Sequence, residues 1–400
     1  MVETLAEKIR NSNIIHGINI KDTKFVISQL ADDTTLFLND KPSLSNVLVM
    51  LSHFAKCAGL KLNKGKSEVI RLGNCVEKSK TVCGMQIVNK PIKTLGVWIS
   101  NDSGEIPELN FKERISKLKN LLNMWKQRAL TLKGKITIIN SLALSQIMYI
   151  CNVLYVSPDI IKEVNDLIFS FLWPKKVHVK KSTIIGLIEE GGLKMPDFEI
   201  KILACKAMWV KRLLLNNKCA VLAESFGLPL QFKEMCKLNV DMKFLDTYHS
   251  TFYRQVLDSW YSLQDIPCKK GSDVMKQFLW FNKNIVVDCK PIFIEAMYKK
   301  SIKYINDLLS EEGQFLQLNT LNDTFGTNLT VMQYNSIKSA IPKEWKRLLR
   351  SVNNRLKIED NENKNISILQ STRFPNVCLT FLTKTFTGNL LGELFRNQRQ

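Results

Sequence analysis

The alternation of apolar and polar residues predicts a β-hairpin near the start of the chain. Residues 25–30 and 34–38 are rich in β-branched and aromatic side chains, which favour strands. The short polar segment Ala31-Asp32-Asp33 separates the two runs and predicts the turn. The pattern therefore places two adjacent carboxylates, those of Asp32 and Asp33, at the tip of a hairpin.

A helical spacing follows this hairpin. Between Ser43 and Ala58 the apolar residues recur every three or four positions, with Ser43 or Ser45 as the expected N-cap. Residues 59–66 then predict a basic turn, which leads into a strand over 67–72. Further short strands are expected between residues 81 and 100.

Beyond Pro107 the spacing is helical. Phe111, Ile115, Leu118, Leu122 and Trp125 form one amphipathic face. Residues 135–154 are apolar nearly all round and predict one central buried helix, and residues 158–172 and 198–216 predict two more, with a loop over 189–197. Helices joined by polar loops, notably 359–365, are expected after residue 217. The predicted class is α+β, with a small antiparallel β part followed by helices.

Composition narrows the class of protein. The 400 residues are 45% apolar and 24% charged, which predicts a globular chain of two or three domains and excludes a disordered acidic chain or a small disulfide scaffold. No run of about 18 apolar residues predicts a membrane helix, and no secretory signal is expected at the start. The ten cysteines form no C-x2-C pair, which predicts reduced, mostly buried thiols without a zinc site. We expect an intracellular protein of the nucleus or cytoplasm.

The net charge of +20 favours a polyanionic partner, of which nucleic acid is the usual one. Residues 111–216 carry half of this excess, a net +10. Within them Lys112, Lys119 and Lys126 repeat every seven residues beside the apolar face. The alternative interpretation is a basic, solvated surface with no specific partner.

Asp32 and Asp33 suit a magnesium ion, because Mg²⁺ prefers hard oxygen ligands and binds through one or two carboxylates plus substrate phosphates. Two such ions can hold the attacking and leaving oxygens of a phosphoryl transfer. The alternative is a plain solvated turn.

The order of these blocks resembles the second half of the palm and the thumb of a reverse transcriptase. It is most similar to the polymerase of non-LTR retrotransposons, that is, of long interspersed elements including the jockey-like ones. The resemblance is strong over residues 24–215 and weaker to about 350. The matching blocks are 29–34, 59–68, 94–97, 128–142, 189–197, 206–213, 303–309 and 334–345.

The resemblance implies roles for individual residues. Asp32 matches the family's metal-binding carboxylate and Asp33 its supporting neighbour, while Leu30 replaces the usual Tyr or Phe. Lys64 or Lys66 matches a basic position that would neutralise or protonate the pyrophosphate leaving group; a solvated turn is the alternative.

Further residues would hold nucleic acid. Leu95-Gly96 matches the hairpin that grips the primer. The thumb cations that would face a template–primer duplex are Lys112, Lys119, Lys126, Arg128, Lys133 and Lys135.

The resemblance thus implies metal-dependent nucleotidyl transfer in the complete enzyme, with Mg²⁺ or Mn²⁺, an RNA template, a DNA primer or target and deoxynucleotides, and no membrane. Residues 1–106 would be the C-terminal half of the palm, 107–216 the helical thumb, and 217–400 a helix-rich region of unknown role.

One departure from the family limits the expected activity. The family's site needs another aspartate, yet upstream of Asp32 only Glu3, Glu7 and Asp22 are acidic, and Asp22 is expected in a turn. The fingers and the nucleotide-selecting block have no counterpart, so the chain would begin in the middle of the palm. We expect no polymerase activity from this chain alone. The alternatives are a non-catalytic nucleic-acid-binding fragment and a decayed relic.

Overall fold

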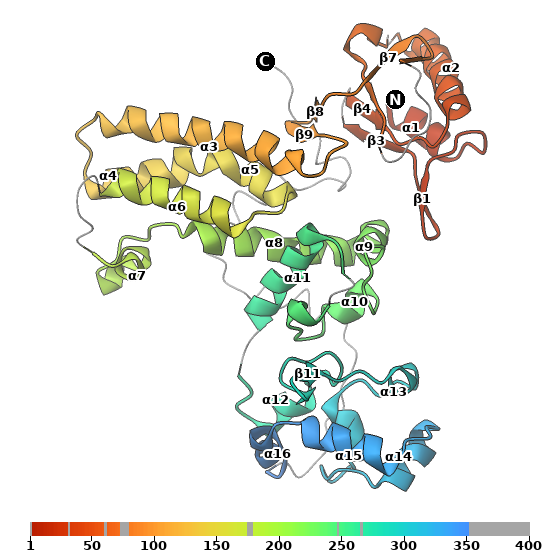
Figure 1. Cartoon of the computed structure of the whole chain (residues 1–400), viewed down its shortest axis with the longest axis vertical. Helices are drawn as coiled ribbons and strands as arrows, with labels where there is room; N and C mark the ends of the chain where they lie inside the picture. The colour runs from red at the N-terminus through yellow and green to blue at the C-terminus, as the bar shows by residue number, and fades with distance from the viewer. Residues whose placement is uncertain are drawn as a thin grey trace. The chain divides into compact units, whose positions relative to one another are not determined.

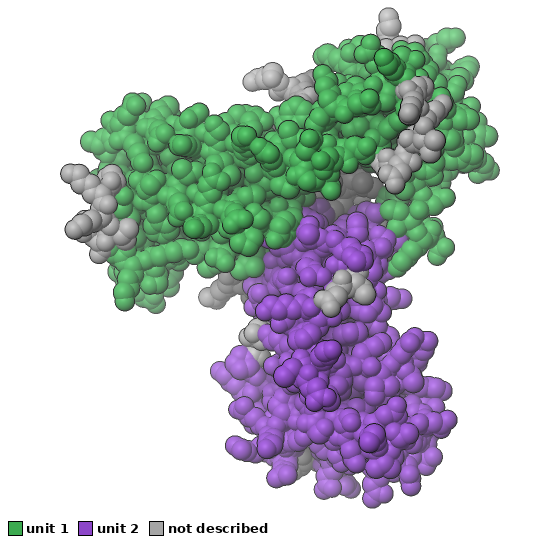
Figure 2. Space-filling view, in the orientation of Figure 1, with its two compact units in different colours: residues 1–205, 375–400 green, residues 206–374 purple. Residues whose placement is uncertain are grey.

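The structure is a computed structural model that describes residues 2–30, 33–59, 62–72, 80–173, 179–245, 248–264 and 267–351. The chain divides into two compact units, which Figure 2 colours separately. The described part of unit 1 lies within residues 1–205, and that of unit 2 within 206–351. Helix α8 (Phe198–Leu215) contains the boundary between them. The chain is α+β, as the sequence pattern predicted.

Unit 1 opens with two short hairpins and two helices (Figure 1). Strands β1 (Ile18–Ile20) and β2 (Thr23–Phe25) pair with each other, as do β3 (Ile27–Leu30) and β4 (Asp33–Leu36), both antiparallel. Helices α1 (Val2–Arg10) and α2 (Lys41–Ala58) bury their apolar faces against β3. The predicted hairpin over 25–38 is confirmed, and Asp22 lies in the turn between β1 and β2 as expected.

Helix α2 begins two residues earlier than the pattern predicted. Its N-cap is Asp40, whose side chain accepts a hydrogen bond from the backbone N–H of Ser43 at 2.7 Å. The prediction of Ser43 or Ser45 as the N-cap was wrong, because both residues lie inside the helix. Asp40, directly before the first helical residue, accepts a hydrogen bond from a free N–H group of the first turn instead. The helix ends at Gly59, whose φ of 69° suits a left-handed C-cap.

The next strands form a small sheet of mixed direction. Strand β7 (Met85–Val88) pairs antiparallel with β6 (Thr81–Val82) and parallel with β5 (Val69–Ile70). The prediction of an antiparallel sheet is therefore wrong for β5. The spacing of apolar residues along one strand does not indicate whether its partner runs parallel or antiparallel. Strands β8 (Ile92–Thr94) and β9 (Val97–Ile99) follow as a separate antiparallel hairpin.

A helical bundle completes most of unit 1. Helix α3 (Glu105–Lys126) packs against α5 (Ser145–Val153) and α6 (Pro158–Leu172) around one apolar core. The predicted amphipathic face of α3 lies in this core, with Phe111 and Leu118 almost fully buried. Truncating one such side chain to alanine typically costs about 2–5 kcal/mol.

The single central helix predicted over 135–154 is wrong. The structure has α4 (Leu132–Ile138), a π-helical segment (Ile139–Ala143) and then α5, with a bend of 46° at the break. The apolar residues on every side of this segment correctly predicted that it is buried. They could not predict the bend, because a straight helix would bury the same residues. Among the described residues no single helix is long and apolar enough to cross a bilayer; only this bent pair passes by length and composition.

After α6 come a short helix, α7 (Lys181–Ile185), a 3₁₀ turn (Ile188–Glu190) and an irregular stretch that leads into α8. The loop predicted over 189–197 is confirmed apart from the end of this 3₁₀ turn.

Unit 2 is mainly helical, as expected, around buried aromatic residues such as Trp260 and Trp280. It also contains one short hairpin that the pattern did not predict, β10 (Val286–Val287) with β11 (Lys290–Pro291). Its helices beyond α8 are α9 (Asn217–Glu224), α10 (Phe232–Met235), α11 (Thr251–Gln264), α12 (Gly271–Met275), α13 (Glu295–Lys299), α14 (Leu318–Phe325), α15 (Val331–Ala340) and α16 (Lys343–Leu349).

The cysteines that the structure describes are all free thiols. Four are buried, namely Cys151, Cys205, Cys219 and Cys236, and burial raises the pKa of the Cys219 thiol. These four thiols are packed as small apolar side chains.

Candidate nucleic-acid interface

The β3–β4 hairpin presents Asp33 where its second strand begins. The two strands pair up to Leu30 and Asp33, and Asp33 is exposed. Beside this pair, Gln29 Nε2 donates to Thr34 Oγ1 at 3.0 Å, which ties the strands together next to the carboxylate. Asp32 lies outside the described residues, so the joint metal role of Asp32 and Asp33 stays a prediction.

Of the two predicted metal ligands, the structure describes Asp33 alone. Mg²⁺ needs near-octahedral oxygen ligands. Within the described ranges, no group of three or more His, Cys, Asp or Glu side chains could hold a metal ion. The buried Gln29 Oε1, which accepts no hydrogen bond from the described residues, is the nearest unpaired polar atom along the chain.

The basic turn after α2 is a 3₁₀ segment, Lys64–Lys66. Asn63 holds it: the backbone N–H of Lys66 donates to Asn63 Oδ1 at 3.2 Å, and Ser67 Oγ donates to the Asn63 carbonyl at 2.9 Å. Lys66 is exposed and free to meet an anion. The side chain of Lys64 lies outside the described residues, so which lysine would meet the pyrophosphate stays open.

The turn of the β8–β9 hairpin is Leu95-Gly96, and both residues have positive φ, 53° and 80°. Two left-handed residues make a type I′ turn, which matches the twist of the flanking strands. Leucine seldom adopts this conformation, and here its side chain is 5% exposed. The Leu95 carbonyl accepts a hydrogen bond from the hydroxyl of Tyr149 on α5 at 2.7 Å, so the turn is fastened to the bundle.

A second set of hydrogen bonds holds the β8–β9 hairpin against α3. Asn110, 2% exposed, accepts from the backbone N–H of Trp98 at 2.8 Å and donates to the Trp98 carbonyl at 3.0 Å. It also donates to the Ile106 carbonyl at 2.8 Å. The amide therefore completes the unpaired edge of β9 as another strand would.

An ion pair reinforces this junction. Lys93 Nζ on β8 lies 3.4 Å from Glu113 Oε2 on α3, and Lys117 Nζ lies 2.6 Å from the other oxygen. The hydrogen bond from Lys117, with Lys93 nearby, lowers the pKa of Glu113 to about 2. Lys93 also lies over the Trp98 ring, 5.2 Å from its centroid. The hairpin and the bundle thus form one body.

The predicted basic stripe on α3 is exposed along its whole length. Lys112, Lys119 and Lys126 are each exposed, and a spacing of seven keeps them on one helix face. Lys112 Nζ pairs with Glu108 Oε1 at 2.8 Å, which raises the pKa of Lys112. Lys119 and Lys126 form no ion pair with any residue that the structure describes, so they are the two α3 cations most available to a phosphate.

The remaining predicted cations have differing surroundings. Arg128 stacks on Trp125, with 5.0 Å between the guanidinium carbon and the ring centroid. Lys133 is exposed on α4. Lys135 Nζ donates to the carbonyl of Leu172 at 3.0 Å, at the end of α6. A cation at a helix C-terminus is favourable, so Lys135 joins α4 to α6, a role that the sequence did not suggest.

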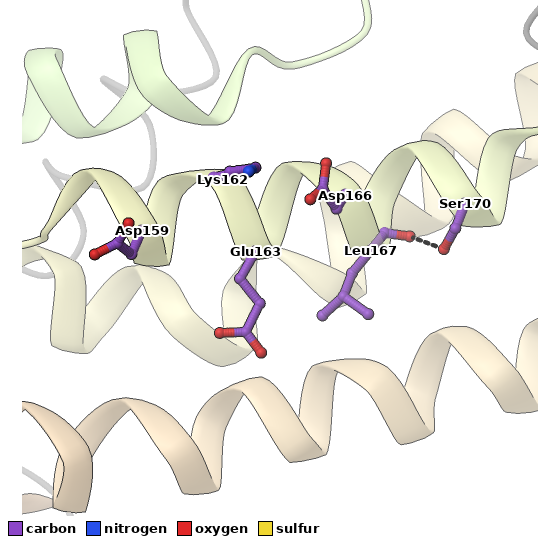
Figure 3. Close-up of a pocket in the computed structure, with 6 residues that line it drawn as sticks. All are labelled: Asp159, Lys162, Glu163, Asp166, Leu167 and Ser170. Carbon is purple, nitrogen blue, oxygen red and sulfur yellow. Dashed lines mark hydrogen bonds between the residues drawn. The ribbon is translucent and has the colours of Figure 1, made fainter.

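A shallow hollow of about 440 Å³ on α6 lies outside the predicted site. Its lining residues all project from α6 (Figure 3) and are Asp159, Lys162, Glu163, Asp166, Leu167 and Ser170. Three carboxylates against one lysine make this surface unfavourable for a polyanion.

Sequence reasoning missed Asn63, Asn110 and Tyr149. Each acts through a hydrogen bond to the backbone, Asn63 within its own turn and the other two to the β8–β9 hairpin. The available signal was weak: Asn110 is a polar residue directly before the apolar face of α3, and Tyr149 lies in an otherwise apolar run.

No protein-family model matches the chain. The chain is similar to the transposon TX1 uncharacterized 149 kDa protein of Xenopus laevis, with 22% identity over 280 residues. The match covers 65% of this chain and 21% of the frog protein. The chain therefore spans about a fifth of the length of the relative that it matches.

Proposed function

We propose that this chain is part of the reverse transcriptase of a non-LTR retrotransposon, an RNA-directed DNA polymerase. Two sources support the proposal: the ordered blocks that resemble that family, and the distant similarity to a transposon-encoded protein, which favours an origin in a transposable element. In the complete enzyme the reaction would be nucleotidyl transfer, with Mg²⁺ held through Asp32 and Asp33.

The observation that carries the proposal is the fixed Leu95-Gly96 turn, which is fastened to the same helical bundle that exposes the cations of α3. A duplex is held through its phosphates and its shape. A backbone turn locked by Tyr149 and Asn110, with Lys119 and Lys126 exposed on the attached helix, provides a rigid surface for that purpose. The chain's own residues would then bind and orient a template–primer duplex.

The sequence favours binding over catalysis by this chain alone, because the acidic residues before Asp32 are only Glu3, Glu7 and Asp22 and none matches the family's further aspartate. Loss of a ligand class at a metal site typically lowers activity by orders of magnitude. A non-catalytic nucleic-acid-binding protein is therefore the second candidate function.

The test is binding of a labelled RNA–DNA template–primer to the purified chain across a salt titration, with and without Mg²⁺. The bundle variant combines Lys119→Gln with Lys126→Gln. The matched control combines Lys162→Gln with Lys194→Gln, two exposed lysines of unit 1 that lie near carboxylates. We expect the bundle variant to lower the slope of log K against log salt by about 2, roughly one per lost phosphate contact, and the control to change it little.

The outcomes separate the candidate functions. Binding that Mg²⁺ strengthens, and that Asp32→Asn weakens, supports the polymerase. Steep salt dependence that Mg²⁺ does not change supports the non-catalytic binding protein. If the chain does not bind the template–primer at low salt, both the polymerase and the non-catalytic binding protein are contradicted. The remaining alternative is then a decayed relic of the element.

A further inference from the structure

Cations gather where α15 meets α16 in unit 2. The α15–α16 cationic surface consists of Lys338, Lys343, Lys346, Arg347 and Arg350. Across residues 331–351 the sequence has one acidic side chain, Glu344. Figure 1 shows α16 next to α12 and α15 at the end of this unit.

The two helices bring these cations close to one another. Lys346 Nζ on α16 donates to the carbonyl of Ser339 on α15 at 3.4 Å. Partial burial, together with Lys338 and Lys343 nearby, lowers the pKa of Lys346. Like charges at spacings of three and four along α16 repel one another as well. In the part of the chain that the structure describes, none of the five forms an ion pair.

Local forces account for the positions of Lys338, Lys346 and Arg347 but not for the uncompensated charge. Lys338 lies over the rings of Phe315 and Tyr334, at 5.4 and 5.2 Å from their centroids. Lys346 and Arg347 lie in the last turn of α16, where the helix dipole favours them. Lys343 occupies the first residue of that helix, where the same dipole is unfavourable to a cation. The five cations are therefore not balanced by acidic side chains on these two helices, where Glu344 is the one acidic residue.

We propose that the α15–α16 cationic surface binds the phosphodiester backbone of nucleic acid, as a second site apart from the α3 face. This inference rests on the proposed function. Among the described residues of α16, no large apolar side chain is strongly exposed; the exposed Val331 and Met332 lie at the start of α15, away in sequence from the cations of α16. Its exposed cations Lys343, Arg347 and Arg350 suit phosphate contacts that read no sequence.

Two phosphate-binding surfaces on one chain make binding bivalent. If both surfaces hold the same strand, the second contact forms at a high effective concentration, and the overall affinity then exceeds that of either surface alone. Losing one surface should therefore weaken binding without abolishing it.

The experiment uses the full chain with Lys343→Gln and Arg347→Gln combined. The matched control combines Lys276→Gln with Lys299→Gln, which are exposed lysines of the same unit; Lys299 pairs with Glu295 at 2.7 Å. The probes are a single-stranded RNA and an RNA–DNA hybrid of equal length, titrated at several salt concentrations. For the α15–α16 variant we expect affinity weaker by on the order of tenfold at low salt and a slope lower by about 1.5–2.

The probes and variants distinguish the possible results. Loss on the RNA alone, on the hybrid alone or on both supports the site and assigns the strand that it holds. An unchanged slope, or an equal loss in the control, overturns the inference. The inference is also overturned if the parent chain binds vesicles of anionic phospholipid and the α15–α16 variant loses that binding but keeps its affinity for both nucleic acids.

The bundle variant separates this inference from the proposed function. If Lys119→Gln with Lys126→Gln weakens hybrid binding and the α15–α16 variant weakens binding to neither probe, the inference fails and the proposed function stands. The reverse pattern keeps the α15–α16 site and contradicts the duplex-binding role of the bundle.

Discussion

The hydroxyl of Tyr149 on α5 donates a hydrogen bond of 2.7 Å to the backbone carbonyl of Leu95, in the turn of a hairpin 54 residues earlier in the sequence. Burial raises the pKa of Tyr149, so the hydroxyl stays protonated and remains a donor at neutral pH. This contact at the turn and the Asn110 amide at Trp98, in the middle of strand β9, hold the hairpin on two different helices. Four predictions follow from this junction and its neighbours.

Tyr149→Phe removes one partly buried hydrogen bond and keeps the ring. We expect a loss of about 1 kcal/mol and a fall in Tm of roughly 2–4 °C for a unit of this size. Thermal unfolding measures the change. Tyr155→Phe, at a side chain 37% exposed, is the control and should change Tm little. Equal Tm values for the two variants would show that the Leu95 contact contributes nothing.

Asn110→Ala leaves the Trp98 N–H and two carbonyls without their partner in a buried place. We expect a loss of about 2–3 kcal/mol of unfolding free energy, measured by urea denaturation. The control is Asn123→Ala on the exposed face of the same helix. A cost below that of the control would contradict the structural role given to Asn110.

Lys135→Met and Lys133→Met should separate stability from binding. Because Lys135 caps the end of α6, its replacement should cost about 1 kcal/mol of stability and leave the salt slope of nucleic-acid binding unchanged. The exposed Lys133 should show the opposite pattern, with a slope lower by about 1. Paired melting and binding titrations measure both variants, and a slope change in Lys135→Met would place that lysine on the nucleic acid instead.

Glu113→Gln tests the ion pairs at the junction through their pH dependence. The pKa of Glu113 is lowered to about 2 from an ordinary value of 4.5. Its stabilising effect is therefore fully present above about pH 4.5 and is lost as pH falls toward 2. The side chain is 39% exposed, so solvent screening limits the effect to about 1 kcal/mol or less. The Tm difference between the parent and the variant should shrink from pH 7 to pH 3, and a constant difference would rule out the charge as its cause.

Local pattern predicted those elements whose signal lies within one segment. Helix α6 matches its expected bounds because Ser157 caps it and Pro158 occupies its first residue. The β3–β4 hairpin was visible from two β-rich runs about a short polar turn. The exposed positions of Lys119 and Lys126 followed from the apolar face beside them.

Features that depend on contacts between distant segments could not be predicted in this way. Strand β5 pairs parallel with β7, and no residue within β5 encodes that direction. The π-helical segment Ile139–Ala143 and the bend that follows it lie in a run whose apolar side chains suit a straight helix equally well. Asn110 and Lys135 resemble ordinary helix-surface residues until the backbone groups that they meet are in place.

The double anchoring of β9 also determines where unit 1 can pivot. A hairpin held at Trp98 by α3 and at Leu95 by α5 moves with the bundle as a rigid lever and cannot act as its hinge. Strand β7 ends at Val88 and β8 begins at Ile92. Residues 89–91 therefore connect β7 to the hairpin that moves rigidly with the bundle. Any rotation of the bundle relative to the β3–β4 hairpin would therefore carry the Leu95-Gly96 turn through the same angle, so the turn and the exposed lysines of α3 would move together as one rigid piece.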